Sequence, residues 1–279
     1  MLETPQFVLA ANLPEDQVRI VSHVERALAG LNGYVSDFAS ALSLYDFAAS
    51  RAAELNAKNV GELSQKLGAA HTSGRFPPDT KAINSIFEEK RRLSDIARAY
   101  HSWMNIAGRD GSMTIYHFAD SMEYTKENVR SSSTLSHFVK LRDLSAVSKR
   151  FYREFPDWKN IRDATGHRAE LTRNPEWQKK QSSKGPVKID SFIDSTGRNT
   201  VIHPQMMGRR FVATNKGRLV GYELSEDSLR KLTELRDAFF AAFSEAERGL
   251  KAMQDAYWED FVHDQHQFAS KLPPQSHDN

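Results

Sequence analysis

Hydrophobic positions recur every three or four residues along most of the chain, which is the spacing of one face of an α-helix. Residues 18–67 carry an Ala-, Leu- and Phe-rich helical pattern that predicts two helices, broken near Gly30 to Gly33. A stronger pattern follows Pro78 and predicts an amphipathic helix that ends at Gly108 to Gly111. Its apolar positions are Ile83, Ile86, Phe87, Leu93, Ile96, Ala97, Tyr100, Trp103, Met104 and Ala107.

The second half of the chain interrupts this helical pattern once. Helices are expected over about 113–130 and 135–155, and again after Pro156. Short runs near 187–224 then predict β-strands, with a turn at Asn215-Lys216-Gly217. Ser225 then predicts the start of one long closing amphipathic helix. We expect three parts: an N-terminal helical extension (1–75), a helical bundle (76–268) with a β insertion at about 185–224, and a flexible tail (269–279).

Composition and missing motifs exclude several classes of function. The 38 Lys and Arg residues nearly balance the 36 Asp and Glu residues, so any RNA site must be a local patch rather than a basic coat. The chain has no cysteine, which excludes disulfides, thiolate metal sites and cysteine nucleophiles and suits a cytoplasmic location. No stretch is apolar enough to cross a membrane, and no motif of a phosphate loop, zinc protease or serine hydrolase is present. We therefore expect no membrane contact, no cofactor and no metal.

One segment carries residues suited to chemistry on RNA. Arg162 and His167 lie five residues apart, with Asp163 directly after the arginine. RNA is cleaved without a metal when one group moves the 2′-hydroxyl proton and another neutralises charge on the phosphorane. Histidine titrates near neutral pH, and arginine offers a permanent fork for phosphate oxygens. On a regular helix the two side chains are about 140° apart and do not share a face. Two ways to bring them to one cleft are a change of geometry at Gly166 and a cleft made with a second subunit.

The run from Arg162 to His167 resembles the signature of the HEPN superfamily, in which an arginine, a polar residue and a few variable residues precede a histidine. The resemblance covers roughly 100–261 and implies a mainly α, HEPN-like helical bundle, with the N-terminal helices as an extension and a small β-hairpin insertion before the last long helix. It also implies a homodimer whose two motifs share one cleft. Some members with a nucleotidyltransferase antitoxin carry a tyrosine two residues after the histidine as the modified site. This chain has Ala169 there, which weakens the toxin–antitoxin interpretation. The resemblance does not identify an antitoxin or other partner protein.

The resulting hypothesis is a metal-independent endoribonuclease of HEPN type acting in defence or stress, with RNA as its partner. His167 is the expected acid and base, Arg162 the phosphate stabiliser and Asp163 the orienting group. The expected substrate-binding residues are Arg168, Lys159 and Arg109. Two alternatives stay open: a catalytically inactive HEPN-like dimer that binds or scaffolds, and an unrelated all-α protein in which Arg162 pairs on a helix surface and His167 caps a helix.

Other candidate residues have ordinary structural explanations beside a functional one. His101 is expected at the edge of a helical core rather than on a metal, and Arg109 in a turn from which it can also reach a phosphate. His263 and His266 have a metal-compatible spacing but lack a third ligand. The basic stretch 179–184 suits either a solvated loop or an RNA backbone track.

Overall fold

The computed structural model describes residues 3–9, 11, 13–72, 80–166, 173–189, 193–195 and 200–271. The chain forms two compact units, each built from several segments. Unit 1 comprises Met1–Tyr34, His117–Glu154 and Lys231–Asn279, and unit 2 comprises Val35–Tyr116 and Phe155–Arg230. Each unit is described by itself below.

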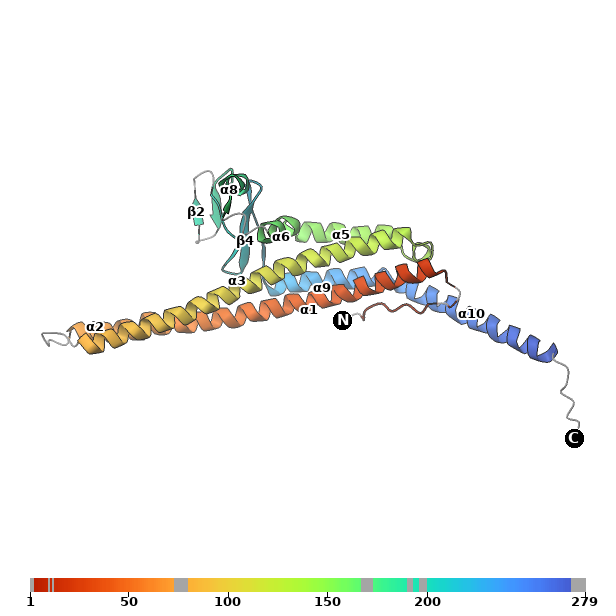
Figure 1. Cartoon of the computed structure of the whole chain (residues 1–279), viewed down its shortest axis with the longest axis horizontal. Helices are drawn as coiled ribbons and strands as arrows, with labels where there is room; N and C mark the ends of the chain where they lie inside the picture. Colours follow the sequence, from red (N-terminus) through yellow and green to blue (C-terminus); the bar gives the residue numbers. More distant parts are fainter. Residues whose placement is uncertain are drawn as a thin grey trace, which may run out of the picture. The chain divides into compact units, whose positions relative to one another are not determined.

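The described chain is mainly helical, with five short strands before the last two helices (Figure 1). This confirms the predicted mainly α fold with a small β insertion. The helices are α1 (Glu15–Lys58), α2 (Ser64–Thr72), α3 (Thr80–Ser131), α4 (Leu135–Phe138), α5 (Leu141–Glu154), α6 (Trp158–Gly166), α8 (Pro175–Gln181), α9 (Glu226–Ala241) and α10 (Ser244–Lys271), and a π-helical segment, η1 (Asn59–Leu63), joins α1 to α2. The strands are β1 (Val187–Ile189), β2 (Ile193–Ser195), β3 (Gln205–Met207), β4 (Arg210–Asn215) and β5 (Arg218–Glu223).

Helices α1 and α3 are each continuous, so both predicted glycine breaks are wrong (Figure 1). A Cβ on Gly33 would meet no atom within 4 Å, and one on Gly30 would make ordinary contacts. These glycines therefore cost helix propensity, about 1 kcal/mol each relative to alanine, without ending the helix. Burial of the surrounding leucines, including Leu28 and Leu31, offsets that cost.

The glycines of α3 have a packing role instead. A Cβ on Gly108 would lie 2.5 Å from Met206 Sδ and from a ring carbon of Phe211, and a Cβ on Gly111 would collide with the Tyr222 hydroxyl oxygen. The absent side chains let the β3–β5 sheet approach the helix backbone directly. The Tyr222 hydroxyl uses this approach to donate a 2.6 Å hydrogen bond to the Gly108 carbonyl oxygen.

The strands of unit 2 form two antiparallel sheets, β1-β2 and β3-β4-β5. β4 and β5 pair from Arg210 opposite Glu223 to Asn215 opposite Arg218, as the predicted turn at Asn215-Lys216-Gly217 requires. Lys216 and Gly217 have φ angles of 49° and 86°, the left-handed conformations of a two-residue hairpin turn. Five of the six residues of β4 are buried, and β4 packs against α6 and α8 in addition to its sheet neighbours β3 and β5.

Unit 1 has a helical core of leucine, valine and phenylalanine side chains. Phe118 of α3 stacks on Phe151 of α5 with ring centres 5.8 Å apart, and both rings are fully buried. The helix predicted over 135–155 is two helices, because Val139 between α4 and α5 adopts an extended conformation. The predicted long closing helix is likewise two helices, with backbone bonds of i,i+3 type at Ala242 and Phe243 between α9 and α10.

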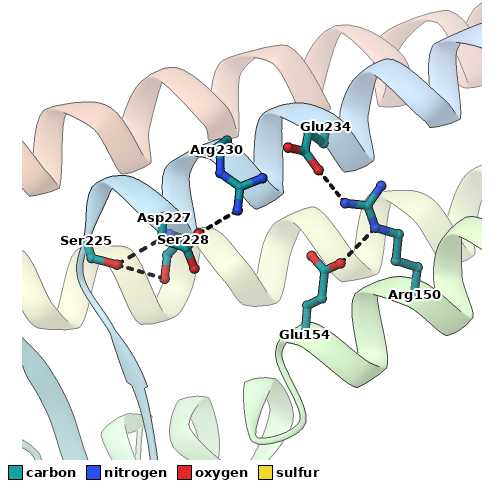
Figure 2. Close-up of polar contacts among 7 residues, drawn as sticks. All are labelled: Arg150, Glu154, Ser225, Asp227, Ser228, Arg230 and Glu234. Atoms are coloured by element: carbon teal, nitrogen blue, oxygen red, sulfur yellow. Dashed lines mark hydrogen bonds and ion pairs between the residues drawn. The ribbon is translucent and has the colours of Figure 1, made fainter.

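One arginine is fully buried in unit 1. The Arg236 side chain is 1% exposed, and its guanidinium donates to Asp237 Oδ1 at 2.9 and 2.7 Å and to Asn32 Oδ1 at 2.9 Å. A buried charge is tolerated only when such partners replace water. Elsewhere in unit 1, Arg150 of α5 bridges Glu154 of the same helix and Glu234 of α9 (Figure 2).

The predicted helix start at Ser225 is confirmed. The Ser225 hydroxyl accepts a hydrogen bond from the Ser228 backbone N–H at 3.3 Å, as expected of an N-cap residue (Figure 2). Glu226 and Asp227 place negative charge in the first turn of α9, where the helix dipole favours it. Within the described residues, no helix combines the length and apolar character needed to cross a membrane.

Candidate functional site

The candidate site is built around helix α6, which two polar anchors fix to the sheet of unit 2. The Asp157 carboxylate, at the start of α6, accepts a 3.2 Å bond from the Gly221 N–H of β5 and pairs with Arg218 at 2.9 Å. One turn later, the Asn160 carbonyl oxygen accepts a 2.8 Å bond from the Asn215 side-chain amide of β4. These contacts determine where the motif residues that follow on α6 are presented.

Arg162 lies against an aromatic side chain of α3. Its guanidinium carbon is 4.7 Å from the centre of the Tyr116 ring, a cation–π distance. Trp158, one turn earlier on α6, contacts the same ring with centres 5.6 Å apart. Because positions i and i+4 are neighbours on a helix surface, Trp158 and Arg162 both pack against the Tyr116 ring. The Arg162 side chain is still 39% exposed, so it remains within reach of a ligand from solvent.

Asp163 is paired with two cations. Its Oδ1 lies 3.4 Å from the Arg162 guanidinium, and its Oδ2 lies 3.6 Å from the Lys216 ammonium in the β4–β5 turn. The Asp163 side chain is 22% exposed and the Lys216 side chain 66%. The carboxylate therefore lies between two exposed positive groups, and it holds both near the same end of α6.

The two other expected substrate-binding residues that the structure describes occupy different places. Lys159 is exposed on α6, one turn before Arg162. Arg109 lies inside α3 and is half-buried, so the predicted turn at this residue is wrong. It is two helical turns before Tyr116, about 10 Å along the helix axis. The structure thus brings Arg162 and Asp163 together and places Arg109 further away.

The expected acid and base, His167, and the expected binding residue Arg168 lie outside the described residues. The described part of the motif ends at Gly166, the last residue of α6. Of the other histidines, His101 is exposed on α3, so its predicted place at a core edge is wrong. His263 is exposed on α10, and in the described parts of the chain no three His, Asp or Glu side chains lie close enough to hold a metal ion.

A pocket of about 180 Å³ opens beside Asp163. Three elements and one turn of unit 2 form its walls: α6, α8, β4 and the turn that follows β4. The lining residues are Asp163, Ala164, Trp177, Gln181, Thr214, Asn215 and Lys216. The motif carboxylate and the turn lysine are therefore also part of a cavity, which the sequence analysis did not predict.

The residues that sequence reasoning missed are those of α8 and β4. Asn174 caps α8 by accepting bonds from the Glu176 and Trp177 N–H groups at 3.0 and 3.2 Å, and Pro175 occupies the first turn. This Asn-Pro start is a recognisable helix signal, and Trp177 and Gln181 follow at a spacing of four. The sequence thus contained a signal for the helix but none for its position beside Asp163.

Comparisons with protein-family models, with curated protein sequences and with solved structures give no match for this chain. Its class is therefore stated from its own structure: a mainly α protein with a small antiparallel β insertion and a charged pocket at the end of α6.

Proposed function

We propose that this protein is a metal-independent endoribonuclease of HEPN type that cleaves RNA at the Arg162–His167 motif. The observation that carries the proposal is the position of Arg162, held by Tyr116 and Asp163 yet 39% exposed, five residues before a histidine. An oriented, partly exposed guanidinium is the kind of group that recognises a pair of phosphate oxygens and their developing negative charge.

The proposed reaction assigns one role to each motif residue. His167 accepts the proton of the 2′-hydroxyl, whose oxygen then attacks the adjacent phosphorus. Arg162 stabilises the additional negative charge on the phosphorane oxygens, and an imidazolium group returns a proton to the departing 5′-oxygen. The products are a 2′,3′-cyclic phosphate and a 5′-hydroxyl. Asp163 positions Arg162, and in a homodimer the second copy of the motif supplies the second imidazole.

Local charge supports an anionic substrate. Near the C-terminal end of α6, two cationic groups, those of Arg162 and Lys216, flank the single carboxylate of Asp163. The balance at this end of α6 is positive, although the whole chain is nearly neutral. A local excess of positive charge attracts a phosphate backbone without requiring a basic protein.

The test is a cleavage assay with purified full-length protein, single-stranded RNA and an excess of chelator. We expect cleavage that leaves cyclic phosphate ends, loss of at least about 100-fold in rate for His167→Ala, and an unchanged melting temperature. Arg162→Lys keeps the positive charge but loses the planar pair of N–H donors. It is expected to retain part of the activity that Arg162→Ala loses. Cleavage that requires a metal ion, or that survives His167→Ala, would contradict the proposal.

A second candidate is a catalytically silent HEPN-like module that binds RNA. It is favoured by the contacts of Arg162 with Tyr116 and Asp163, because a side chain engaged in this way also serves as a structural anchor. RNA binding by the wild-type protein without cleavage under any of these conditions would select this candidate. Size-exclusion chromatography with light scattering tests the expected homodimer in both cases.

A further inference from the structure

The pocket beside Asp163 has the size of a single ring system. Its volume is about 180 Å³, and an apolar cavity of about 150 Å³ accepts a benzene molecule. The half-buried indole of Trp177 forms one wall, and the buried methyl group of Ala164 contributes to another. A flat ring can therefore enter and lie against an aromatic side chain.

Three buried polar side chains also line this pocket, each with a defined hydrogen bond to the main chain. Gln181, 7% exposed, accepts from the Lys216 N–H through Oε1 at 2.8 Å. Asn215, 2% exposed, donates to the Asn160 carbonyl oxygen through Nδ2 at 2.8 Å. Thr214 accepts from the Ile202 N–H at 2.9 Å. These bonds engage the acceptor end of Gln181 and the donor end of Asn215.

The opposite end of each amide is the one that a ligand can use. Gln181 offers the two hydrogens of Nε2, and Asn215 offers the lone pairs of Oδ1. Among the described residues, neither of these two atoms takes part in a hydrogen bond. A donor and an acceptor from two residues of one pocket lining suit a nucleobase, whose edge carries donor and acceptor atoms next to each other.

The pocket lining combines two charged side chains with aromatic and neutral ones. The charged lining residues are Lys216, whose side chain is 66% exposed, and Asp163, which is in turn paired with Arg162. A ring inside the pocket would thus lie beside Asp163, and Asp163 contacts the motif arginine, Arg162. A ring-sized pocket with an aromatic wall and neighbouring cations has the features by which proteins bind single-stranded nucleic acids.

We infer that the pocket binds one unpaired nucleobase of the RNA, and thereby selects single-stranded RNA and places its phosphate at Arg162. This inference rests on the proposed function, because it takes RNA as the ligand of the motif. A base that is paired in a duplex is stacked between its neighbours and cannot enter. The pocket is therefore a specificity site next to the reacting groups, and not part of them.

The experiment measures binding of three labelled probes by fluorescence anisotropy: a single-stranded RNA, a duplex of the same sequence, and an abasic strand of equal charge. His167→Ala protein is used so that no probe is cut. We expect the single strand to bind at least about tenfold more tightly than either the abasic strand or the duplex. Ala164→Leu fills the pocket and is expected to remove this preference while leaving abasic binding unchanged.

Trp177→Leu is the second variant, in case the larger residue at position 164 prevents folding, and it is expected to reduce the preference severalfold. Glu176→Gln, on α8 but outside the pocket lining, is the matched control and should behave as the parent protein. Equal binding of the single-stranded and abasic probes, or a preference that survives both pocket variants, would overturn the inference. A base preference in this binding experiment, together with no cleavage by the wild-type protein, would instead overturn only the endoribonuclease proposal.

Discussion

The guanidinium of Arg162 and the ring of Tyr116 lie 4.7 Å apart, so a residue of α3 orients the motif arginine of α6. The ring is also in contact with Trp158, the residue one turn before Arg162. The orientation of Arg162 therefore depends on a residue 46 positions earlier in the chain, outside the motif itself.

Replacing this ring is expected to weaken the action of Arg162. Tyr116→Leu removes a cation–π contact of about 0.5–1 kcal/mol, and we expect a two- to fivefold loss of kcat/KM on RNA. Tyr116→Phe keeps the ring and should retain most of the activity. Rates are compared at equal folded fraction, measured by circular dichroism. Equal losses in both variants would mean that the hydroxyl group, and not the ring face, matters.

Lys216 is expected to neutralise one phosphate of the RNA. Each phosphate that a protein neutralises on a single strand steepens the plot of log affinity against log salt by about 0.7. Lys216→Gln should therefore reduce the salt dependence of RNA binding by about that amount, while Glu245→Gln on α10 should not. The measurement is anisotropy titration at several salt concentrations. An unchanged slope would place Lys216 away from the RNA backbone.

Two helix glycines should respond to alanine in opposite directions. A methyl group on Gly108 meets Met206 and Phe211 at 2.5 Å, whereas one on Gly33 meets nothing within 4 Å. We expect Gly108→Ala to lower the free energy of unfolding by about 1–3 kcal/mol and Gly33→Ala to raise it by about 1 kcal/mol. Urea denaturation measures both. A stabilising Gly108→Ala would show that the sheet does not approach α3 this closely.

Tyr222 should make stability fall at alkaline pH. Burial, with a smaller contribution from the Asp110 carboxylate, raises the pKa of the Tyr222 hydroxyl well above its ordinary value of 10.0. The pKa of this hydroxyl is higher in the folded state than in the unfolded state. Its contribution to the free energy of unfolding is therefore complete below pH 10, and it is lost as the pH rises from there through the folded-state pKa. Tyr222→Phe is expected to be about 1 kcal/mol less stable at pH 7. The difference should shrink or reverse above pH 10, and a constant difference would contradict this assignment.

The ion pair of the fully buried Arg236 in unit 1 should be far more sensitive to mutation than a pair of exposed side chains. Asp237→Ala leaves the fully buried Arg236 guanidinium with Asn32 as its remaining described hydrogen-bond partner, which is expected to cost about 3 kcal/mol. Glu245→Ala breaks a pair with Arg248 whose side chains are 66% and 71% exposed, at a cost below about 1 kcal/mol. Thermal or urea unfolding of both variants gives the comparison.

Sequence periodicity predicted the helical class and the β insertion because both depend on local patterns. Ser225 and the Asn215-Lys216-Gly217 turn carry short-range chemistry that acts in the same way in any fold. Gly108 misled the prediction, because a glycine that ends a helix and one that admits a neighbouring sheet look identical in a sequence. Only the tertiary contact with Phe211 distinguishes them.

The candidate site shows the same difference between local features, which the sequence predicts, and tertiary contacts, which it does not. Arg162 and Asp163 were identifiable because the motif is local, and their mutual contact follows from adjacency. Lys216 was predicted only as part of a turn, and nothing in the sequence placed it 3.6 Å from Asp163, more than fifty positions away. Trp177 and Gln181 belong to the pocket through the packing of α8 beside β4, which no short-range pattern encodes.

Gln181, Thr214 and Asn215 are each tied to a main-chain atom before any ligand arrives. Their rotamers are fixed when the chain folds, so a ligand does not have to immobilise them, a step that otherwise costs about 0.5–1.5 kcal/mol for each flexible side chain. Fragment-sized heterocycles far smaller than an RNA should therefore bind measurably in this cavity. A fragment screen by ligand-observed NMR can thus map which ring edges the cavity accepts.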